Sequence, residues 1–173
     1  YKKALEINKE LYGKKHFRVT NNATNIARQY IKEGQLDSAL SYNTYALETG
    51  QNILPSGHPQ LIRIIHNHAS IFNRKGNYGK SDSLHRKAIE VANESDNNDA
   101  PNRGNVYLSW AKNALQQQQP DSALHYYHKS FQARKKNFGL TDSLTQISLK
   151  ELVGLLRKTG HNQKADSLSR LYK

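Results

Sequence analysis

The chain has 173 residues, with 26 lysines and arginines against 14 aspartates and glutamates, so its formal net charge is +12. It contains no cysteine, which excludes disulfides and thiol chemistry. No apolar run approaches the roughly 18 residues of a membrane-spanning helix, and no signal peptide is recognisable. Because the sequence does not begin with methionine, we expect it to be a fragment of a longer protein.

A short pattern returns every 42 residues along the chain. Positions 34, 76, 118 and 160 are Gly34, Gly76, Gln118 and Gly160. A small residue follows each of them by five positions, as Ala39, Ser81, Ala123 and Ala165. Four copies in register, without insertion or deletion, predict a repeat protein, in which each unit packs on its neighbours.

Each repeat contains two stretches with helical periodicity. The clearest stripe combines positions i, i+3, i+4, i+7, i+8 and i+11, occupied by Leu61, Ile64, Ile65, His68, Ala69 and Phe72. This spacing places all six on one face of a helix and would scatter them over both faces of a strand. The first helices are predicted at 18–33, 60–75, 102–117 and 144–159. The second helices are predicted to begin near Asp37, Gly79, Asp121 and Gln163.

In chain order, residues 1–15 are predicted to be a second helix whose hairpin partner is missing. The repeats that follow are predicted at 16–57, 58–99 and 100–141, with a partial fourth at 142–173, all in one array spanning 1–173. Residues Gln163–Lys173 are only the start of the second helix of the fourth repeat. Both ends are therefore expected to be cuts through a longer array.

Three places break the regular pattern. The connector at 94–102 is rich in asparagine and acidic residues, but it lacks the ligand order and terminal glutamate of a calcium loop, so we interpret it as a solvated turn. The glutamines at 116–119 replace the glycine turn and should end their helix, while Pro120 suits the first turn of the next. Gly154 lies inside a predicted helix and costs it about 1 kcal/mol, so the fourth repeat should be the loosest.

Small residues at fixed spacing carry a resemblance to a known family. The triplets are Ala27–Ala39–Ala46, Ala69–Ser81–Ala88 and Ala111–Ala123–Ser130. This spacing resembles tetratricopeptide repeats, and the 42-residue period resembles their longer kinesin-light-chain class. Asn25 and Asn67, and the turns before the first helices, follow the same class, whereas Val153 departs from it by replacing the small residue. The resemblance implies an all-α fold, a right-handed α-solenoid of helix-turn-helix hairpins.

The positive charge is concentrated on the predicted first helices. Those four segments contain eleven basic residues against Glu33 and Glu151, and so hold +9 of the +12. The resemblance implies that first helices line the concave wall. A concave basic wall concentrates the electrostatic field and attracts acidic partners. We therefore expect a protein–protein interaction scaffold that binds an extended, acidic peptide or protein segment in this groove.

The resemblance also implies which residues face the groove. One inward row reads Asn25, Asn67, Ser109 and Glu151, and an asparagine there can hold a peptide backbone because its amide both donates and accepts hydrogen bonds. The candidate peptide-binding residues on this and neighbouring rows are Asn21, Asn25, Arg28, Lys32, Arg63, His66, Asn67, Arg74, Ser109 and Lys112. Each neutral contact is worth only about 1 kcal/mol, so several repeats must act together.

The histidines do not predict an active site. His66 and His68 flank an asparagine, but residues two apart on a helix face different directions, and His68 takes a core position. His125 and His128 could share a metal, yet no third ligand is evident nearby. No activated nucleophile and no glycine-rich phosphate loop is present. We expect no enzymatic activity, no cofactor and no metal.

Two other functions stay open at this point. A basic helical repeat could track the phosphates of a nucleic acid, although the inner rows lack the aromatic side chains on which single strands stack. Alternatively, the array could be the sensor or docking arm of a larger regulatory or enzymatic protein, such as a histidine kinase or a caspase-like protease. The expected cut ends are compatible with that alternative.

Overall fold

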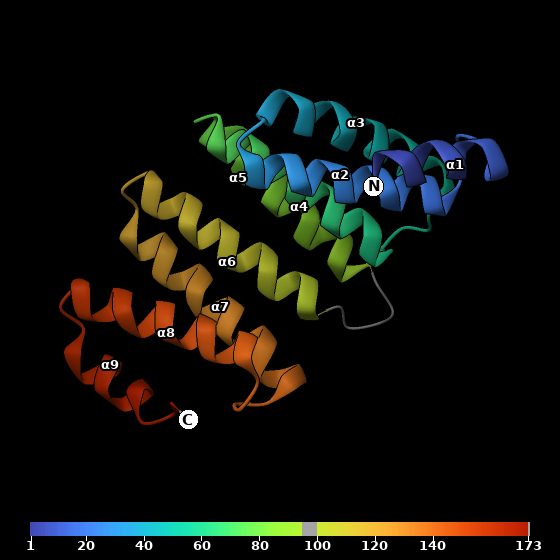
Figure 1. Ribbon diagram of the computed structural model, residues 1–173. Helices are drawn as coiled ribbons and strands as arrows, with labels where there is room; N and C mark the ends of the chain where they lie inside the picture. The colour runs from blue at the N-terminus through green and yellow to red at the C-terminus, as the bar shows by residue number, and fades with distance from the viewer. Residues whose placement is uncertain (95–99, 173) are drawn as a thin grey trace. The chain divides into compact units, whose positions relative to one another are not determined.

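A computed structural model describes residues 1–94 and 100–172, and all regular secondary structure in those two ranges is α-helical (Figure 1). The all-α fold class is therefore confirmed. The helices are α1 (Lys2–Tyr12), α2 (Phe17–Glu33), α3 (Leu36–Ile53), α4 (Pro59–Arg74), α5 (Tyr78–Asn93), α6 (Ala100–Gln116), α7 (Pro120–Phe138), α8 (Ser143–Lys158) and α9 (Asn162–Ser169).

The helices pair as hairpins in the predicted order. The first helices α2, α4, α6 and α8 coincide with the predicted segments to within two residues at each end. The second helices α3, α5, α7 and α9 each begin one residue before the predicted position. Each first helix packs on the second helix that follows it, and α1 packs on α2. Hydrophobic periodicity was therefore a sufficient guide to these elements.

The chain divides into two compact units. Unit 1 is Tyr1–Asn98 and contains α1 to α5, and unit 2 is Asp99–Lys173 and contains α6 to α9. The single array over 1–173, with its repeat boundaries, stays a prediction. Most of the connector interpreted as a solvated turn, residues 95–99, lies outside the described residues.

The turns inside the four hairpins repeat the same backbone geometry at the 42-residue period. Gly34, Gly76 and Gly160 have φ values of 77°, 76° and 81°. Gln118 takes the equivalent place with φ 57°, and it is the only non-glycine residue with positive φ in the described ranges. A side chain in this left-handed conformation costs roughly 1–2 kcal/mol. The glutamine run thus ends α6 as predicted, with Pro120 opening α7, but it keeps a turn that favours glycine.

The predicted small residues lie where helices approach most closely. All nine members of the three triplets have zero exposed surface. In the two serines the hydroxyl also bonds the facing backbone: Ser81 Oγ donates to the Ala69 carbonyl at 2.9 Å, and Ser130 Oγ donates to the Gly104 carbonyl at 2.8 Å. A larger side chain at these positions would force the helices of a hairpin apart.

Each unit has its own apolar core. In unit 1 the core includes Leu5, Val19 and Ile26, with Ile64 from the second hairpin. In unit 2 it includes Phe131, Leu149 and the other buried side chains of α6 to α9. Helix α8 continues unbroken through Gly154. In unit 1, polar side chains of α2 and α4, including Asn25 and Asn67, stay outside this core.

Candidate functional site

The first helices of unit 1 form one continuous polar surface. Helix α2 contacts α4 directly. In the described part of unit 1, the second helices α3 and α5 contact each other less. Residues at i, i+4, i+7 and i+11 share one helix face. We call the surface made by these positions the α2–α4 face; it consists of Asn21, Asn25, Arg28 and Lys32 on α2 and Arg63, Asn67, Ser70 and Arg74 on α4.

Hydrogen bonds join α2 to α4 across this face, and one of them links residues that stand 42 apart in the sequence. Arg63 Nη2 donates to Asn21 Oδ1 at 3.0 Å, and it also donates to Gln60 Oε1. Gln60 Nε2 in turn donates to Thr24 Oγ1 at 3.0 Å. The acceptors on Asn21 and Gln60 are neutral, so these bonds orient the guanidinium without cancelling its charge.

Arg74 ties the other end of the face together. Its Nη1 donates to the backbone carbonyl of Ile31 in the last turn of α2. Carbonyls there have no partner inside their own helix, and a nearby cation also suits the negative end of the helix dipole. The neighbouring Lys75 is joined to Asp37 at 2.6 Å. Arg74 thus positions α4 against α2 while its side chain stays exposed.

The α2–α4 face is cationic. Four of its eight positions are basic, namely Arg28, Lys32, Arg63 and Arg74, and none is acidic. Arg28, Lys32 and Arg74 are exposed, and Arg28 also donates to Asn25 at 3.4 Å, which is a long hydrogen bond. Asn25 and Asn67 lie between the cations and are partly exposed. The face therefore offers amide groups flanked by positive charge.

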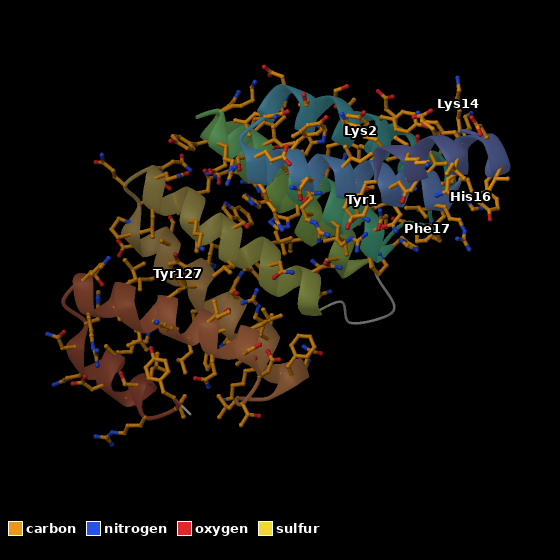
Figure 2. The ribbon with its side chains drawn as sticks, viewed as in Figure 1. Tyr1, Lys2, Lys14, His16, Phe17 and Tyr127 are labelled. Carbon is orange, nitrogen blue, oxygen red and sulfur yellow. The ribbon has the colours of Figure 1, made fainter. Side chains whose placement is uncertain are left out.

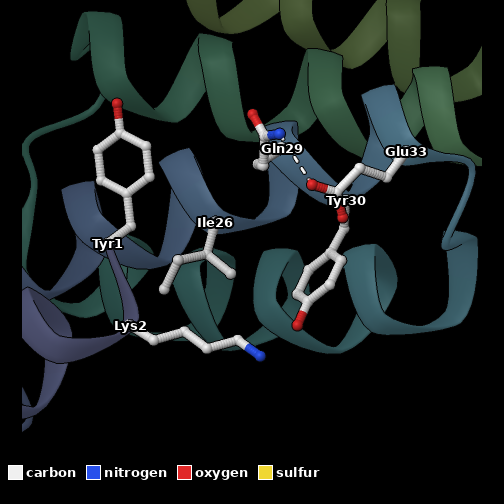
Figure 3. A pocket seen from close by; sticks show the side chains of 6 residues that line it. All are labelled: Tyr1, Lys2, Ile26, Gln29, Tyr30 and Glu33. Carbon is white, nitrogen blue, oxygen red and sulfur yellow. Dashed lines mark hydrogen bonds between the residues drawn. The ribbon is translucent and has the colours of Figure 1, made fainter.

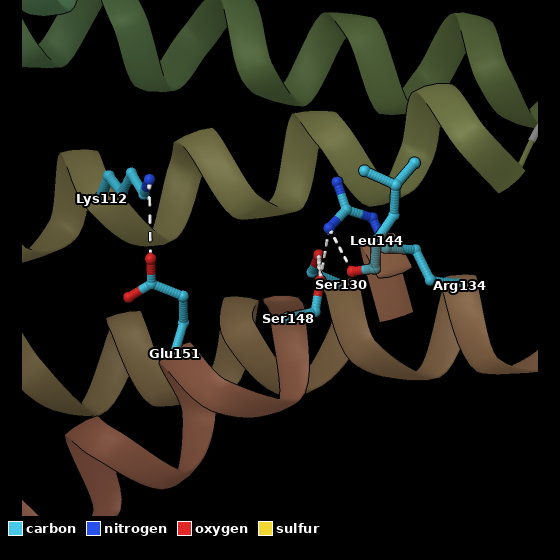
Figure 4. A network of polar contacts seen from close by, with 6 residues as sticks. All are labelled: Lys112, Ser130, Arg134, Leu144, Ser148 and Glu151. Atoms are coloured by element: carbon cyan, nitrogen blue, oxygen red, sulfur yellow. Dashed lines mark hydrogen bonds and ion pairs between the residues drawn. The ribbon is translucent and has the colours of Figure 1, made fainter. Parts of the chain in front are cut away.

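The equivalent positions of unit 2 have a different chemistry. They are Asn105, Ser109, Lys112 and Gln116 on α6, and Ile147, Glu151, Gly154 and Lys158 on α8, which we call the α6–α8 face. Lys112 Nζ lies 3.8 Å from Glu151 Oε1 (Figure 4). One of the two cations of the α6–α8 face is therefore paired with a carboxylate. Both partners are well exposed, and such pairs contribute little to stability. The pair does reduce the positive charge that this face presents.

A cavity of about 410 Å³ opens on the α6–α8 face, and Gly154 is among the residues that line it. Apolar side chains of Leu115, Ile147 and Leu155 line it together with Lys150 and Lys158. The phenol of Tyr127 from α7 also lines it, in addition to Glu151. Burial, and to a smaller extent the charge of Glu151, raises the pKa of Tyr127 to about 12. This phenol is therefore a neutral hydrogen-bonding group at neutral pH.

Of the ten predicted binding residues, seven lie on the α2–α4 face, and the structure brings Asn21 to Arg63 and Asn25 to Arg28. Ser109 and Lys112 belong to unit 2, so no relation between them and the other seven is assigned. His66 lies in a neighbouring row of α4, and its ring centroid is 6.1 Å from that of His85 on α5. His66 therefore faces the second helix of its own hairpin.

The prediction that His68 is a core residue is confirmed. Its side chain is 8% exposed, and its Nδ1 lies 2.9 Å from Asn43 Nδ2. The same Asn43 nitrogen donates to the Ile64 carbonyl at 2.9 Å, and the ring stacks on Phe72. Burial lowers the pKa of His68, so its neutral imidazole can accept the hydrogen bond from Asn43.

A buried arginine joins three helices of unit 2 and was missed from the sequence. Arg134 on α7 is 1% exposed and donates from Nη1 to the Leu144 carbonyl at 2.8 Å and to Ser148 Oγ at 2.7 Å (Figure 4). Its Nη2 donates to Asn105 Oδ1 at 2.6 Å. A Cβ on Gly104 would lie 2.7 Å from this side chain. The signal was available, because the repeat places Gly50 and Ala92 at the same register as Arg134.

Histidines before α2 and α4 are helix caps, a role that the sequence analysis did not assign. His16 Nδ1 accepts from the Arg18 amide at 3.2 Å, and His58 Nδ1 accepts from the Gln60 amide at 3.1 Å. These residues occupy equivalent places, and Asp142 performs the same task for α8 at 3.0 Å. In Figure 2, His16 and Phe17 mark the turn between α1 and α2.

A pocket of unit 1 lies between the start of α1 and α2 (Figure 3). Its volume is about 270 Å³, and Lys2, Tyr30 and Glu33 are among the residues that line it. Lys2 Nζ lies 5.2 Å from the centre of the Tyr30 ring, while Gln29 donates to Glu33 at 2.8 Å. These groups are already engaged with one another, so the pocket adds no convergent set of free polar groups.

The described residues contain neither a metal site nor a membrane-spanning helix. In residues 1–94 and 100–172, no three histidine, cysteine or carboxylate groups converge as a metal site would require. Within the same ranges, no helix is both long and apolar enough to cross a bilayer.

Comparison with known proteins supports the repeat assignment. Residues 60–136 match the family model described as tetratricopeptide repeat. The fold of BtubC (BKLC) from P. vanneervenii matches with a TM-score of 0.83 and 17% identity, over 98% of this chain and 68% of that one. Two crystal structures of nearly identical TPR-like repeats from a putative kinesin light chain of Podosopora anserina give TM-scores of 0.73 and 0.71. Both are 17% identical and cover 98% of this chain and 80% and 81% of theirs.

The predicted tetratricopeptide repeats are thereby confirmed by sequence over residues 60–136. Over 98% of the chain, the solved structures show the same fold. No curated protein matches the sequence. Tetratricopeptide repeats generally mediate protein–protein interactions and are generally not enzymes.

Proposed function

We propose that the α2–α4 face of unit 1 binds an extended, acidic peptide segment, and that the protein acts through it as a protein–protein interaction scaffold. The observation that carries this proposal is the composition of the face, which has four cations and no carboxylate over its eight positions. Like charges are held on one surface at a cost in repulsion, and an acidic ligand relieves that repulsion.

The amide groups of the face supply the second part of the binding. Asn25 and Asn67 stand one repeat apart, in the row expected to hold a peptide backbone. A carboxamide can donate to a peptide carbonyl and accept from a peptide N–H at once. Each such bond contributes only about 1 kcal/mol, so the charges provide most of the affinity and the amides fix the register of the peptide.

Pre-organisation supports the role of Arg63. Its guanidinium is held by Asn21 and Gln60 before any ligand arrives, so less side-chain entropy is lost on binding. Arg28 and Lys32 are exposed and can adjust to the spacing of the acidic residues, whereas Arg74 is held by its hydrogen bond to the Ile31 carbonyl. The face therefore combines two fixed cations with two adaptable ones.

The α6–α8 face contributes less to this function. Its net charge over the eight positions is only +1, because Glu151 opposes Lys112. Ser109 and Lys112 were predicted as peptide contacts and remain proposed ones. We assign them a supporting role, in which an acidic ligand must first displace Glu151 from Lys112.

The proposal is tested by fluorescence anisotropy with labelled acidic peptides and the full chain. The variant Arg28→Glu with Arg74→Glu reverses two exposed cations of the α2–α4 face and should weaken binding by about tenfold or more. The matched control, Lys135→Glu with Lys136→Glu, makes the same change in net charge at two exposed positions of α7. It should change the dissociation constant by less than about threefold.

Salt and peptide chemistry provide the remaining arms of that test. Affinity should fall as the salt concentration rises, because screening weakens the exposed cations. A peptide in which asparagine replaces aspartate should bind more weakly than its acidic parent. Equal losses in the two double variants would contradict the proposal, and a random RNA that binds more tightly than the acidic peptides would favour the nucleic-acid alternative.

A further inference from the structure

A cavity on a different side of unit 2 lies outside the faces discussed so far. It has a volume of about 230 Å³ and lies between α7, α8 and the start of α9. Leu124, His125 and His128 come from α7, Leu152 and Leu156 from α8, and His161 and Lys164 from the start of α9. It shares no residue with the cavity beside Gly154.

The lining combines an apolar floor with hydrogen-bond donors. Leu152 and Leu156 are each 2% exposed and form the floor. Three imidazoles and the ammonium group of Lys164 surround it, and no carboxylate is among the residues that line it. Each neutral imidazole carries one N–H, each charged one carries two, and Lys164 supplies three donors. Such a lining is complementary to an acceptor-rich, negatively charged group attached to an apolar body.

The carboxylates of the described part of unit 2 are engaged elsewhere or lie outside this cavity. Asp166 pairs with Arg157 at 3.5 Å, and Glu151 pairs with Lys112 at 3.8 Å. Asp142 accepts from the Thr145 amide at 3.0 Å as the cap of α8. Asp121 is exposed in the first turn of α7. The positive character of the cavity is therefore not cancelled by an ion pair within its lining.

A metal ion does not account for the three histidines. In the described residues no three potential ligands are close enough together to hold one. His161 Nδ1 lies 3.0 Å from Thr159 Oγ1, which leaves its Nε2 as the ring nitrogen for other partners. Separate donors spread around a cavity suit the several oxygens of an oxyanion better than a single metal centre.

We propose that the cavity between α7, α8 and α9 binds a small organic oxyanion, a phosphate monoester or a carboxylate with an apolar body. Lys164 and the imidazoles of His128 and His161 bind the oxygens, and the leucines of α8 bind the apolar body. This site is independent of peptide binding on the α2–α4 face. Its failure would therefore leave the proposed scaffold function untouched.

Binding should strengthen as the pH falls. Burial, and then the charges of Lys164 and His125, lower the pKa of His128. The charged groups on the surrounding helices are Asp121, Lys129, Arg134, Lys135 and Lys136 on α7, Lys150, Glu151, Arg157 and Lys158 on α8, and Lys164 and Asp166 on α9. Of these, only Lys164 lines the cavity. An anion bound beside His128 would favour its protonated form, and by linkage protonation favours the anion.

The test is an NMR titration of the full chain with phenyl phosphate and with benzoate, at about pH 5.5 and about pH 8, on either side of the ordinary histidine pKa. The two probes distinguish the phosphate source from the carboxylate source. Inorganic phosphate and phenol are the controls that remove the apolar body and the charge. We expect tighter binding at the lower pH, with shifts confined to α7, α8 and α9.

Variants decide whether the binding occurs in this cavity. Lys164→Gln and His128→Gln should each weaken binding of the preferred probe by about tenfold at the lower pH. The first removes a positive charge, and the second removes the imidazole whose protonation is linked to binding of the anion. Lys136→Gln removes the same charge from an exposed position of α7 outside the cavity, and should leave the affinity unchanged. Absence of binding by both probes, equal binding of inorganic phosphate, or equal effects of the three variants would overturn the proposal.

Discussion

The α2–α4 face and the α6–α8 face are built from the same register positions and differ in chemistry. Unit 2 has the larger net charge, +7 against +5 in unit 1. Even so, the face of unit 1 has four cations and no acid, whereas that of unit 2 has Lys112 and Lys158 against Glu151. Net charge alone therefore does not show where the cations gather. The register of the charges within the repeat does.

The packing between hairpins shows the same contrast. In unit 1, a Cβ on Gly50 of α3 would lie 3.3 Å from Ile64 Cδ1 on α4, so this junction is close and apolar. The equivalent residues of unit 2 are Arg134 and Ser148, which are joined by a hydrogen bond of 2.7 Å. One repeat register thus supports a small apolar contact in one unit and a buried polar network in the other.

The largest expected effect comes from removing that network. Arg134→Ala should lower the free energy of unfolding of unit 2 by about 3 kcal/mol or more, because it leaves a cavity and deprives three acceptors, among them the fully buried Ser148, of their donor. Urea unfolding followed by the fluorescence of Trp110 reports on unit 2, since this is the only tryptophan in the chain. The neighbouring, exposed Lys135→Ala is the control, and a loss no greater than in that control would contradict the structural role of Arg134.

Acid should distinguish the units next. Burial lowers the pKa of His66 to about 4, and burial followed by the charge of His66 lowers that of His85 to about 3. Folding therefore favours the neutral rings, so their contribution to stability is complete above the unfolded pKa of about 6.5 and is lost as the pH falls from there towards 3. His85 is 1% exposed and His66 only partly buried, so we assign most of the effect to His85.

By about pH 4, His85 alone should cost unit 1 on the order of 3 kcal/mol. Hydrogen exchange measured by mass spectrometry at several pH values can follow α4 and α5 separately from α7 and α8. The replacement His85→Gln should remove much of the pH dependence, even if it lowers stability at neutral pH. Equal acid sensitivity of the two units would break the comparison.

Two glycines of unit 2 should respond to alanine in opposite directions. A Cβ on Gly104 meets the buried Arg134 side chain at 2.7 Å, so Gly104→Ala should destabilise by about 2 kcal/mol. A Cβ on Gly154 meets nothing within 4 Å, and the helix gains about 1 kcal/mol from losing a glycine. Thermal unfolding of the two variants checks both signs. A stable Gly104→Ala protein would show that Arg134 can move.

The smallest expected effect concerns the turn at Gln118. Gln118 has a left-handed backbone conformation, and the three equivalent positions with this conformation, Gly34, Gly76 and Gly160, are all glycine. Gln118→Gly should therefore stabilise unit 2 by about 0.5–1 kcal/mol. The glycine removes the backbone strain, but it loses more conformational entropy on folding, which offsets part of the gain. The reverse change in unit 1, Gly76→Gln, should destabilise by a similar amount. Chemical unfolding of the pair measures both, and a destabilised Gln118→Gly variant would contradict the strain.

Much of the fold could be predicted from the sequence because the signals involved are local. The stripe from Leu61 to Phe72 defines a helix by its period, and Gly34, Gly76 and Gly160 define turns by their backbone freedom. The buried small residues follow from a spacing of twelve and seven. Each of these depends on the chain within one repeat.

The rest depends on contacts between helices far apart in the sequence. The repeat register could have singled out Arg134, but its acceptors Leu144, Ser148 and Asn105 could not be predicted. Their approach is set by the packing of α6, α7 and α8. The pairing of Lys112 with Glu151 likewise joins two repeats. His66 was predicted to face the groove, because its position on α4 neighbours the inward row. The structure places its ring near that of His85, so it faces α5.

The most direct test of the account compares the two faces under the same change of charge. Dissociation constants for one acidic peptide should be measured on Arg28→Glu with Arg74→Glu, and on Lys112→Glu with Lys158→Glu, at low and moderate salt. We predict a loss of about tenfold or more for the unit 1 variant and a markedly smaller loss for the unit 2 variant. Equal losses, or the larger loss in unit 2, would contradict the claim that the α2–α4 face is the principal peptide-binding surface.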